Sequence, residues 1–177
     1  SMDSNTANQL MAEAKFFRAF NYFYLVKTFG DVPLLLEPTT LNNLFPKRET
    51  AAKVYAQIET DLKDAINVLP AKTFAANGHR ITKYVAAMVL TDVYFHQGDY
   101  ANAKTYAKIV VESPHTLTAN TDLSANSAYN KLRSTDDLDE VIYCQEFDAS
   151  IKNSSWWPTY AFSSSATAIF GTFSIFE

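Results

Sequence analysis

Few residues of this 177-residue chain could catalyse a reaction or bind a metal ion, and they lie far apart in the sequence. The three histidines, His79, His96 and His115, form no His-x-x-x-His pair and have no carboxylate at ligand spacing. Cys144 is the single cysteine, so it can form neither an intrachain disulfide nor a zinc cluster, and a buried, inert thiol is expected. The acidic run at 136–140 lacks the glycine and the spacing of an EF-hand loop, which favours a solvated turn. The sequence therefore predicts no enzyme, no metal site and no cofactor.

Aromatic residues are the unusual feature of the composition, since 13 Phe, 10 Tyr and 2 Trp make up 14% of the chain. Some of them must form the core, and others could stack on a flat or ring-shaped ligand. The segment 153–176 contains both tryptophans and no charged residue. A segment this apolar needs cover from other protein, so we interpret the chain as a fragment of a longer protein.

Charge and hydropathy exclude two further classes of function. The formal net charge is −4, and the only local basic cluster is the pair Lys47 and Arg48, whereas a nucleic-acid surface needs many clustered cations. No run of residues approaches the ~20 apolar residues of a membrane-spanning helix. We therefore expect neither nucleic-acid binding nor a membrane span in this sequence.

Helical periodicity and capping residues predict four helices, over residues 6–29, 50–69, 82–97 and 100–112. Gly30 should end the first with a left-handed cap, and an extended segment with two prolines should follow it. Only Gly98 and Asp99 separate the last two helices, which must therefore pack as an antiparallel hairpin. This hairpin is similar to a tetratricopeptide unit, and the first two helices could form an earlier, poorer one.

The predicted fold is therefore mainly α, built from tetratricopeptide-like antiparallel helix hairpins. Residues 1–114 should form this helical scaffold. Residues 115–177 should form a loop-rich, aromatic-rich part that is incomplete and contains one or two short strands. The strand candidate is residues 140–147, which mix β-branched and aromatic side chains.

Several side chains receive a structural role from the pattern alone. The helix at 6–29 is apolar around most of its circumference and should be buried among several neighbours. Arg18, within it, should pair with a carbonyl or carboxylate group and not with a ligand. We expect Tyr94 and Tyr100 to pack together within the hairpin, and Asp31 to shape the turn after Gly30.

Four motifs in order resemble one known family. They are AEAKFFRAFNYF at 12–23, FGDVPL at 29–34, the pattern V-Y-x-x-I-x-x-D-L-x-x-A-I-x-x-L-P at 54–70, and the Gly-Asp-Tyr turn at 98–100. Together they resemble the SusD/RagB family of nutrient-binding proteins from the Bacteroidetes, and the likeness extends over residues ~10 to ~148.

The resemblance implies a function that the residues alone do not show. Members of this family are surface lipoproteins that bind glycans beside a TonB-dependent outer-membrane transporter (SusC-like), on a framework of tetratricopeptide-like helix pairs. The resemblance therefore implies a glycan ligand, a transporter partner and an outer-membrane location. It also implies membrane association only through a lipid anchor that is absent from this sequence.

Sugar binding in such proteins rests on aromatic rings, because the negative face of a ring attracts the C–H bonds of a pyranose. The best candidates for ligand binding are Trp156, Trp157 and Tyr160; alternatively, these rings pack on protein outside this sequence. Two other functions stay open. A tetratricopeptide adaptor would bind peptide tails in a polar, basic groove, and an all-helical glycoside hydrolase would need two carboxylates across a cleft.

Overall fold

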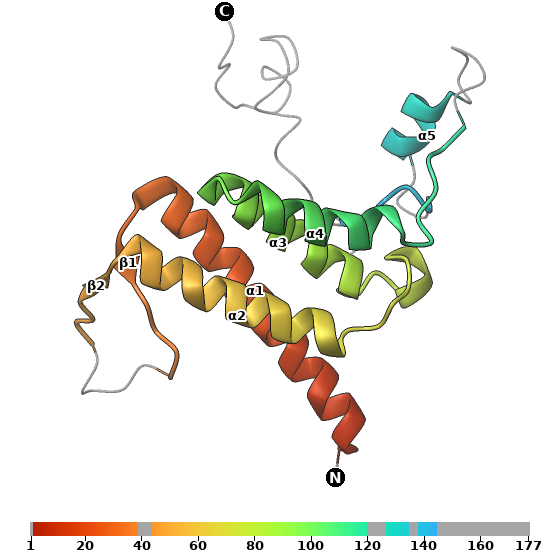
Figure 1. Cartoon of the computed structure of the whole chain (residues 1–177). Coiled ribbons are helices and arrows are strands. Elements are labelled where there is room, and N and C mark those ends of the chain that lie inside the picture. Colours follow the sequence, from red (N-terminus) through yellow and green to blue (C-terminus); the bar gives the residue numbers. More distant parts are fainter. Residues whose placement is uncertain (1, 39–43, 120–126, 135–137, 145–177) are drawn as a thin grey trace, which may run out of the picture. The chain divides into compact units, whose positions relative to one another are not determined.

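Helices dominate the parts of the chain that the structure, a computed structural model, describes: residues 2–38, 44–119, 127–134 and 138–144. These residues contain α1 (Ser4–Phe29), α2 (Ala51–Val68), α3 (Lys83–Gln97), α4 (Tyr100–Val111) and the short α5 (Ala128–Ser134), together with a 3₁₀ turn, η2 (Ala75–Asn77) (Figure 1). The two-residue strands β1 (Val32–Pro33) and β2 (Arg48–Glu49) pair antiparallel. The predicted mainly α fold is confirmed. None of the described helices is long and apolar enough to cross a membrane.

The predicted caps of α3 and α4 are present. Thr82 caps α3 by accepting a hydrogen bond from the N–H of Val85, and Gly98 ends it in the left-handed conformation (φ 76°, ψ 9°). Asp99 then caps α4 by accepting from the N–H of Asn102. Because no further residue separates the two helices, the chain must reverse here, and α3 and α4 pack together as the expected hairpin.

The first helix ends differently from the prediction. Gly30 has the expected positive φ of 67°, but its ψ of −121° belongs to the first central position of a type II′ turn, not to a left-handed cap. The turn leads directly into β1. Asp31 also has a longer reach than expected, because its Oδ1 accepts a hydrogen bond of 2.8 Å from the N–H of Ala51. Asp31 and Thr50 thus both satisfy backbone donors at the start of α2.

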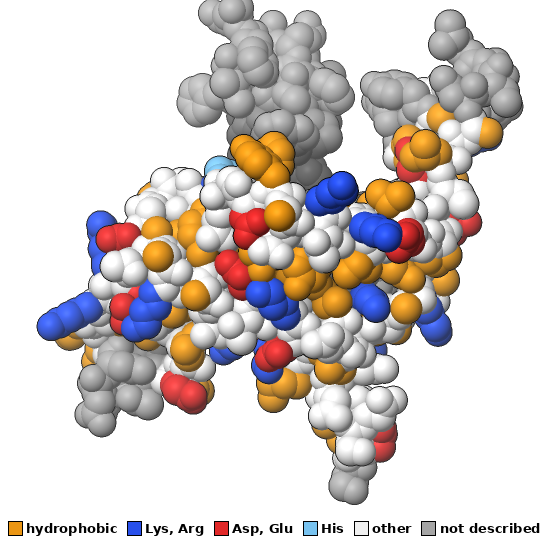
Figure 2. Space-filling model, viewed as in Figure 1, with side chains coloured by type: hydrophobic (Ala, Val, Ile, Leu, Met, Phe, Trp, Pro, Cys, Tyr) orange, Lys and Arg blue, Asp and Glu red, His pale blue; other side chains and the backbone are white. Residues whose placement is uncertain are grey.

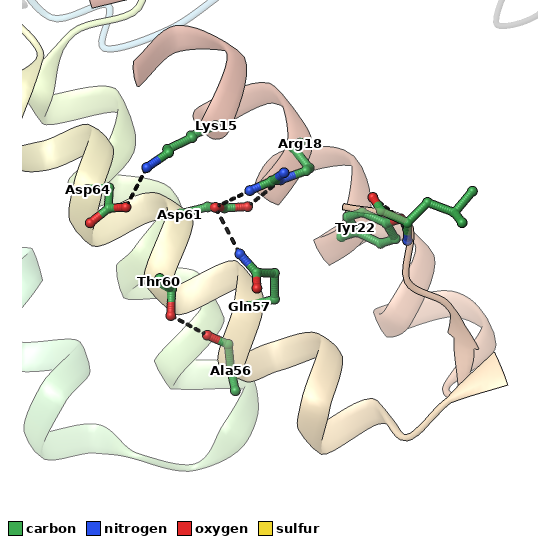
Figure 3. Close-up of polar contacts among 9 residues, drawn as sticks. Lys15, Arg18, Tyr22, Ala56, Gln57, Thr60, Asp61 and Asp64 are labelled. Atoms are coloured by element: carbon green, nitrogen blue, oxygen red, sulfur yellow. Dashed lines mark hydrogen bonds and ion pairs between the residues drawn. The ribbon is translucent and has the colours of Figure 1, made fainter. Parts of the chain in front are cut away.

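A buried ion pair joins α1 to α2. The guanidinium of Arg18 makes two hydrogen bonds to the carboxylate of Asp61, with Nε–Oδ2 at 2.7 Å and Nη2–Oδ1 at 2.6 Å. The side chain of Asp61 is only 2% exposed, and Gln57 donates a further hydrogen bond to it. Figure 3 shows these groups meeting between the two helices. The prediction that Arg18 satisfies a protein carboxylate is confirmed.

A second ion pair shows how the two helices run. The Nζ atom of Lys15 lies 2.7 Å from Oδ2 of Asp64. Moving three residues forward from Lys15 to Arg18 therefore corresponds to moving three residues backward from Asp64 to Asp61 (Figure 3). The helices α1 and α2 are thus antiparallel and in a single register, and they form the first helix pair of the fold.

The burial of α2 follows the predicted face, whereas that of α1 does not. The apolar face of α2 is buried at Val54, Ile58, Leu62, Ala65 and Ile66, as its periodicity predicts. In α1 only one stripe is buried, at Ala12, Phe16, Ala19, Phe23 and Val26. The expectation that α1 is buried on most sides is wrong for the described residues, because its helical neighbours, α2 and to a smaller extent α3, cover one side only. Large side chains therefore stay exposed on it, among them Met11, Phe17, Tyr24 and Leu25.

Tyr94 packs within the second hairpin, but not with the predicted partner. Its ring stacks on Tyr106 of α4, with the ring centroids 5.6 Å apart, whereas Tyr100 contacts Phe95. The reason is geometric: Tyr94 lies on the α3 face that turns inward, and Tyr100, the first residue of α4, is 65% exposed. The same inward Tyr94 also reaches α2.

A polar cluster around Glu59 ties α2 to α3. The Tyr94 hydroxyl donates to Oε2 of Glu59 at 2.6 Å, Gln97 donates to Oε1 at 3.1 Å, and Lys63 bonds the same carboxylate at 3.2 Å. Burial by itself raises the pKa of Glu59, but these three hydrogen bonds outweigh it and lower the pKa. Tyr94, and after it Glu59, raise the pKa of Lys63 to about 12. This polar cluster, the Glu59 clasp, joins α2 of the first helix pair to the α3–α4 hairpin.

The predicted strand at 140–147 is wrong for its described part. Residues 139–140 form a turn and residues 141–144 are irregular, while 145–147 lie outside the described residues. A strand needs a neighbouring strand for its backbone groups, and here the side chains pack on helices instead: Tyr143 contacts Phe20 of α1. The strands that the structure does contain pair Val32 with Glu49 and Pro33 with Arg48.

Removing the guanidinium of Arg18 should strongly destabilise the fold, because it leaves the buried carboxylate of Asp61 without a counter-ion. We expect Arg18→Met to lower the free energy of unfolding by about 3 kcal/mol, measured by urea denaturation followed by circular dichroism. Lys15→Met, which breaks the exposed pair with Asp64, is the control and should cost under about 1 kcal/mol. Equal losses in the two variants would show that burial of Asp61 does not set the strength of the pair.

The Glu59 clasp should weaken in acid. Because the pKa of Glu59 is lowered in the folded state, its ionised form stabilises the protein above its ordinary value of 4.5, and this contribution is lost as the pH falls below it. Tyr94→Phe should cost about 1 kcal/mol at neutral pH, and the difference from the natural protein should shrink in acid. Thermal unfolding of both proteins across the acid range tests this; a difference that stays constant would contradict it.

Candidate functional site

The predicted ligand-binding residues, Trp156, Trp157 and Tyr160, lie outside the described residues. Their role therefore stays a prediction. The described chain ends at Cys144, the first residue of a second unit, Cys144–Glu177, which follows the compact unit Ser1–Tyr143.

Tyr143, the last residue of the first unit, packs against two other aromatic rings. Its ring meets Phe20 of α1 edge to face at a centroid distance of 6.2 Å, and meets Phe74 in the same way at 5.6 Å. Phe74 is 2% exposed and stacks in turn on His79 at 5.3 Å. Aromatic pairs of this geometry stabilise packing beyond the area they bury. These contacts hold Tyr143 against the helical scaffold.

A groove of about 330 Å³ lies beside the end of α4. Its size is at the lower end of the range for small-molecule sites. Its walls are mostly aliphatic, with His115 and Glu140 as the ionisable groups, and its lining residues are Val110, Val111, His115, Thr116, Leu117, Glu140 and Ile142. The groove can therefore take an apolar group that makes one or two hydrogen bonds.

His115 lies half-buried in this groove. Its Nδ1 lies 2.7 Å from Oγ of Ser113, and its buried Nε2 has no hydrogen-bond partner among the described residues. Burial lowers the pKa of His115, and the nearby Asp139 offsets only part of this effect. The backbone N–H of Thr118 donates to Glu140 at 2.8 Å and lowers the pKa of that carboxyl group. Glu140 is thus held as a carboxylate by the backbone.

The described residues do not assemble a metal site beside the groove. No group of three or more His, Cys, Asp or Glu side chains converges anywhere in the described part of the chain. The acidic run 136–140 lies partly outside it, and within it Glu140 is engaged with Thr118. A smaller groove of about 160 Å³ between α1 and α2 is lined by the Lys15–Asp64 pair, whose charges already satisfy each other.

Sequence reasoning missed the roles of Tyr143 and His115. The sequence places Tyr143 in a predicted strand, and its aromatic type in an apolar run is the only signal of a packing role. Nothing in the sequence brings His115 together with Ile142, because 26 intervening residues separate them and the contact depends on the path of the chain after α4. Both roles depend on tertiary structure.

The chain matches a SusD-like family described as "starch-binding associating with outer membrane" over residues 1–95. The match covers more than half of the chain and includes α1, α2 and most of α3. These are the helices joined by Arg18, Asp61 and the Glu59 clasp.

Individual relatives agree with this match. SusD-like protein P2 of Formosa agariphila is 29% identical over 176 residues, which cover 96% of this chain and 33% of the relative. The crystal structure of a SusD-like protein from Bacteroides fragilis is 25% identical with a TM-score of 0.74, over 86% of this chain and 30% of that one. A laminarin-binding SusD-like protein is 30% identical with a TM-score of 0.66, over 78% and 30%. The chain thus spans about a third of the length of these relatives.

Truncating Tyr143 should loosen the junction that it packs. We expect Tyr143→Ala to lower the free energy of unfolding by about 2 kcal/mol, because the half-buried ring loses both aromatic partners. Tyr143→Phe keeps both ring contacts and should stay within about 0.5 kcal/mol of the natural protein. Chemical denaturation measures both; a large loss in the Phe variant would place the contribution in the hydroxyl group instead.

Proposed function

Because this chain belongs to the SusD-like family of carbohydrate-binding proteins, we propose that it binds nutrient glycans, either oligosaccharides or polysaccharides, at the cell surface. The observation that carries the proposal is the family match over residues 1–95, whose description names starch binding. A solved relative that binds laminarin and shares 30% identity with the chain supports it further. Starch and laminarin are both glucans, so glucans are the first ligands to test.

The contacts to the sugar come, in this proposal, from Trp156, Trp157 and Tyr160. Indole and phenol rings offer a flat negative face to the C–H bonds of a pyranose, and the neighbouring Ser, Thr and Asn side chains can bond its hydroxyl groups. The same segment, 153–176, carries no charge, which suits a neutral ligand.

The partner in this proposal is a TonB-dependent outer-membrane transporter, to which the protein would deliver its glycan for import. The family description places its members in association with the outer membrane. Attachment would use a lipid on a cysteine outside these 177 residues, since Cys144 lies in the interior of the chain.

A tetratricopeptide-type adaptor for proteins or peptides is the alternative. Such an adaptor would need a groove with polar and basic walls, whereas the groove beside α4 is mostly aliphatic. Figure 2 shows Lys and Arg side chains interspersed with Asp and Glu on the face in view, not gathered into a basic field. These observations give no support to a polar, basic peptide groove in the described part of the chain.

Titration of the whole protein with starch-derived and laminarin-derived oligosaccharides, followed by tryptophan fluorescence, tests the proposal. We expect saturable binding, and we expect Trp156→Ala and Trp157→Ala each to weaken it about tenfold or more through the loss of a stacked ring. Tyr24→Ala is the matched control, because Tyr24 is an aromatic residue of α1 that is 57% exposed and lies outside the proposed segment.

The outcomes separate the hypotheses. Binding that survives both tryptophan substitutions would remove the site from this segment while keeping the glycan function. Binding to no glycan, together with capture of a peptide ligand, would favour the adaptor. Release of reducing sugar during the titration would instead indicate a glycoside hydrolase.

A further inference from the structure

His115 lies at a junction between separate parts of the described chain. Its ring meets the ring of Tyr84, in α3, edge to face, with the centroids 5.4 Å apart and the planes at 89°. Three residues further on, the backbone N–H of Thr118 donates to the carboxylate of Glu140 at 2.8 Å. The segment 113–118, which follows α4, is therefore held both by α3 and by Glu140.

The ring of His115 has a hydrogen bond at only one of its two nitrogens. Its Nδ1 lies 2.7 Å from Oγ of Ser113, and the backbone N–H of His115 donates to the same oxygen at 3.3 Å. The other ring nitrogen, Nε2, is closed off from solvent and has no hydrogen-bond partner among the described residues. Since almost none of its surface is open, neither a ligand nor further protein can reach Nε2 unless the ring moves.

The neutral and the charged ring differ in what they require at Nε2. In a neutral imidazole one nitrogen carries the proton; with the proton on Nδ1, which can donate to Ser113, Nε2 presents only a lone pair. The imidazolium carries an N–H at both nitrogens, and a charged donor that is buried without an acceptor is costly. The closed junction therefore accepts the neutral ring and opposes the charged one.

The ionisable groups around the ring do not remove this cost. These groups are Tyr84 on α3, Lys108 and Glu112 at the end of α4, and Asp139 and Glu140. Lys108 and Glu112 pair with each other at 3.5 Å, and Glu140 accepts from the backbone of Thr118. The charge of Asp139 favours the imidazolium, but burial outweighs it and lowers the pKa of His115.

We propose that His115 is an acid-sensitive latch, whose protonation releases the segment 113–118 from α3 and from Glu140. In the released segment water solvates the new N–H, so the ring takes up its proton near the ordinary pKa of 6.5. The closed segment takes up this proton only at lower pH. The stability that the latch contributes is thus complete above pH 6.5 and is lost as the pH falls below that value. The inference involves no ligand, so its test is separate from that of the glycan-binding function.

Amide hydrogen exchange in the whole protein, followed by NMR, tests the latch at the backbone N–H of Thr118. Once the rates are corrected for the ordinary effect of pH, we expect the protection of this amide to fall about fivefold between about pH 7.5 and about pH 5.5. Ala107, within α4, should keep its protection. Glu59 and Glu140 do not interfere, because this range lies above the ordinary glutamate pKa of 4.5 and the pKa of each is lowered further.

Two variants assign the response to one histidine. His115→Phe keeps a ring beside Tyr84 but cannot take up a proton, so the Thr118 amide should be equally protected at both pH values. His96→Phe replaces an exposed histidine of α3 and is the matched control, in which the fall in protection should persist. The ¹³C signals of labelled histidine, assigned with these variants, should show a pKa of His115 below 6.5 in the natural protein.

Equal protection of the Thr118 amide at both pH values in the natural protein would overturn the proposal, and so would a pKa of His115 at or above 6.5. A fall in protection that persists in His115→Phe would assign the acid response to another group. A Thr118 amide without protection even at about pH 7.5 would show that the segment is not closed, which also contradicts the latch. If His115→Phe does not fold, the histidine titration and the exchange of the natural protein decide the question.

Discussion

The fold depends on the ion pair between Arg18 and Asp61, because a carboxylate that is almost fully removed from water must have a permanent counter-charge. The planar guanidinium is well suited to this task, since it meets both carboxylate oxygens at once, and the Asp61 carboxylate in turn raises the pKa of Arg18. This geometry allows one register between α1 and α2. A register that takes Arg18 out of reach would leave Asp61 buried without a counter-charge.

The remaining helices follow from that register. With α2 fixed on α1, the Glu59 carboxylate faces α3 and receives Tyr94 and Gln97 from it. Arg80, which precedes α3, reaches back to Glu13 of α1 at 2.9 Å. Each helix packs mainly on the previous one, α1 on α2, α2 on α3 and α3 on α4, as in a solenoid. In such an arrangement the first and last helices keep one uncovered face, and both α1 and α4 show this in their exposed apolar side chains.

Local sequence information predicted the local structure well. Caps such as Thr82 and Asp99, the stop at Gly98 and the apolar face of α2 all depend on residues a few positions apart, and each is present. The failures involve residues that are distant in sequence. The hydrogen bond from Ala51 to Asp31 and the stacking of Tyr94 on Tyr106, not Tyr100, depend on the packed fold. Residues 140–144 form no strand, and no partner strand for them lies in the described parts of the chain. Sequence spacing alone also gives no sign that Asp61, flanked by polar Thr60, is buried.

The motifs that carry the family resemblance contain the residues that hold the helical scaffold together. Arg18 lies in the first, Gly30 and Asp31 in the second, Asp61 in the third, and Gly98 and Asp99 in the fourth, and each of them joins or ends helices in the structure. Similarity at these positions therefore reports the scaffold, and a scaffold by itself does not define a ligand. In the proposed function, the choice of glycan would come from aromatic and polar side chains that the scaffold does not require. In that proposal Trp156 and Trp157 are the side chains of this kind, since they lie in a charge-free segment that also offers Ser, Thr and Asn side chains.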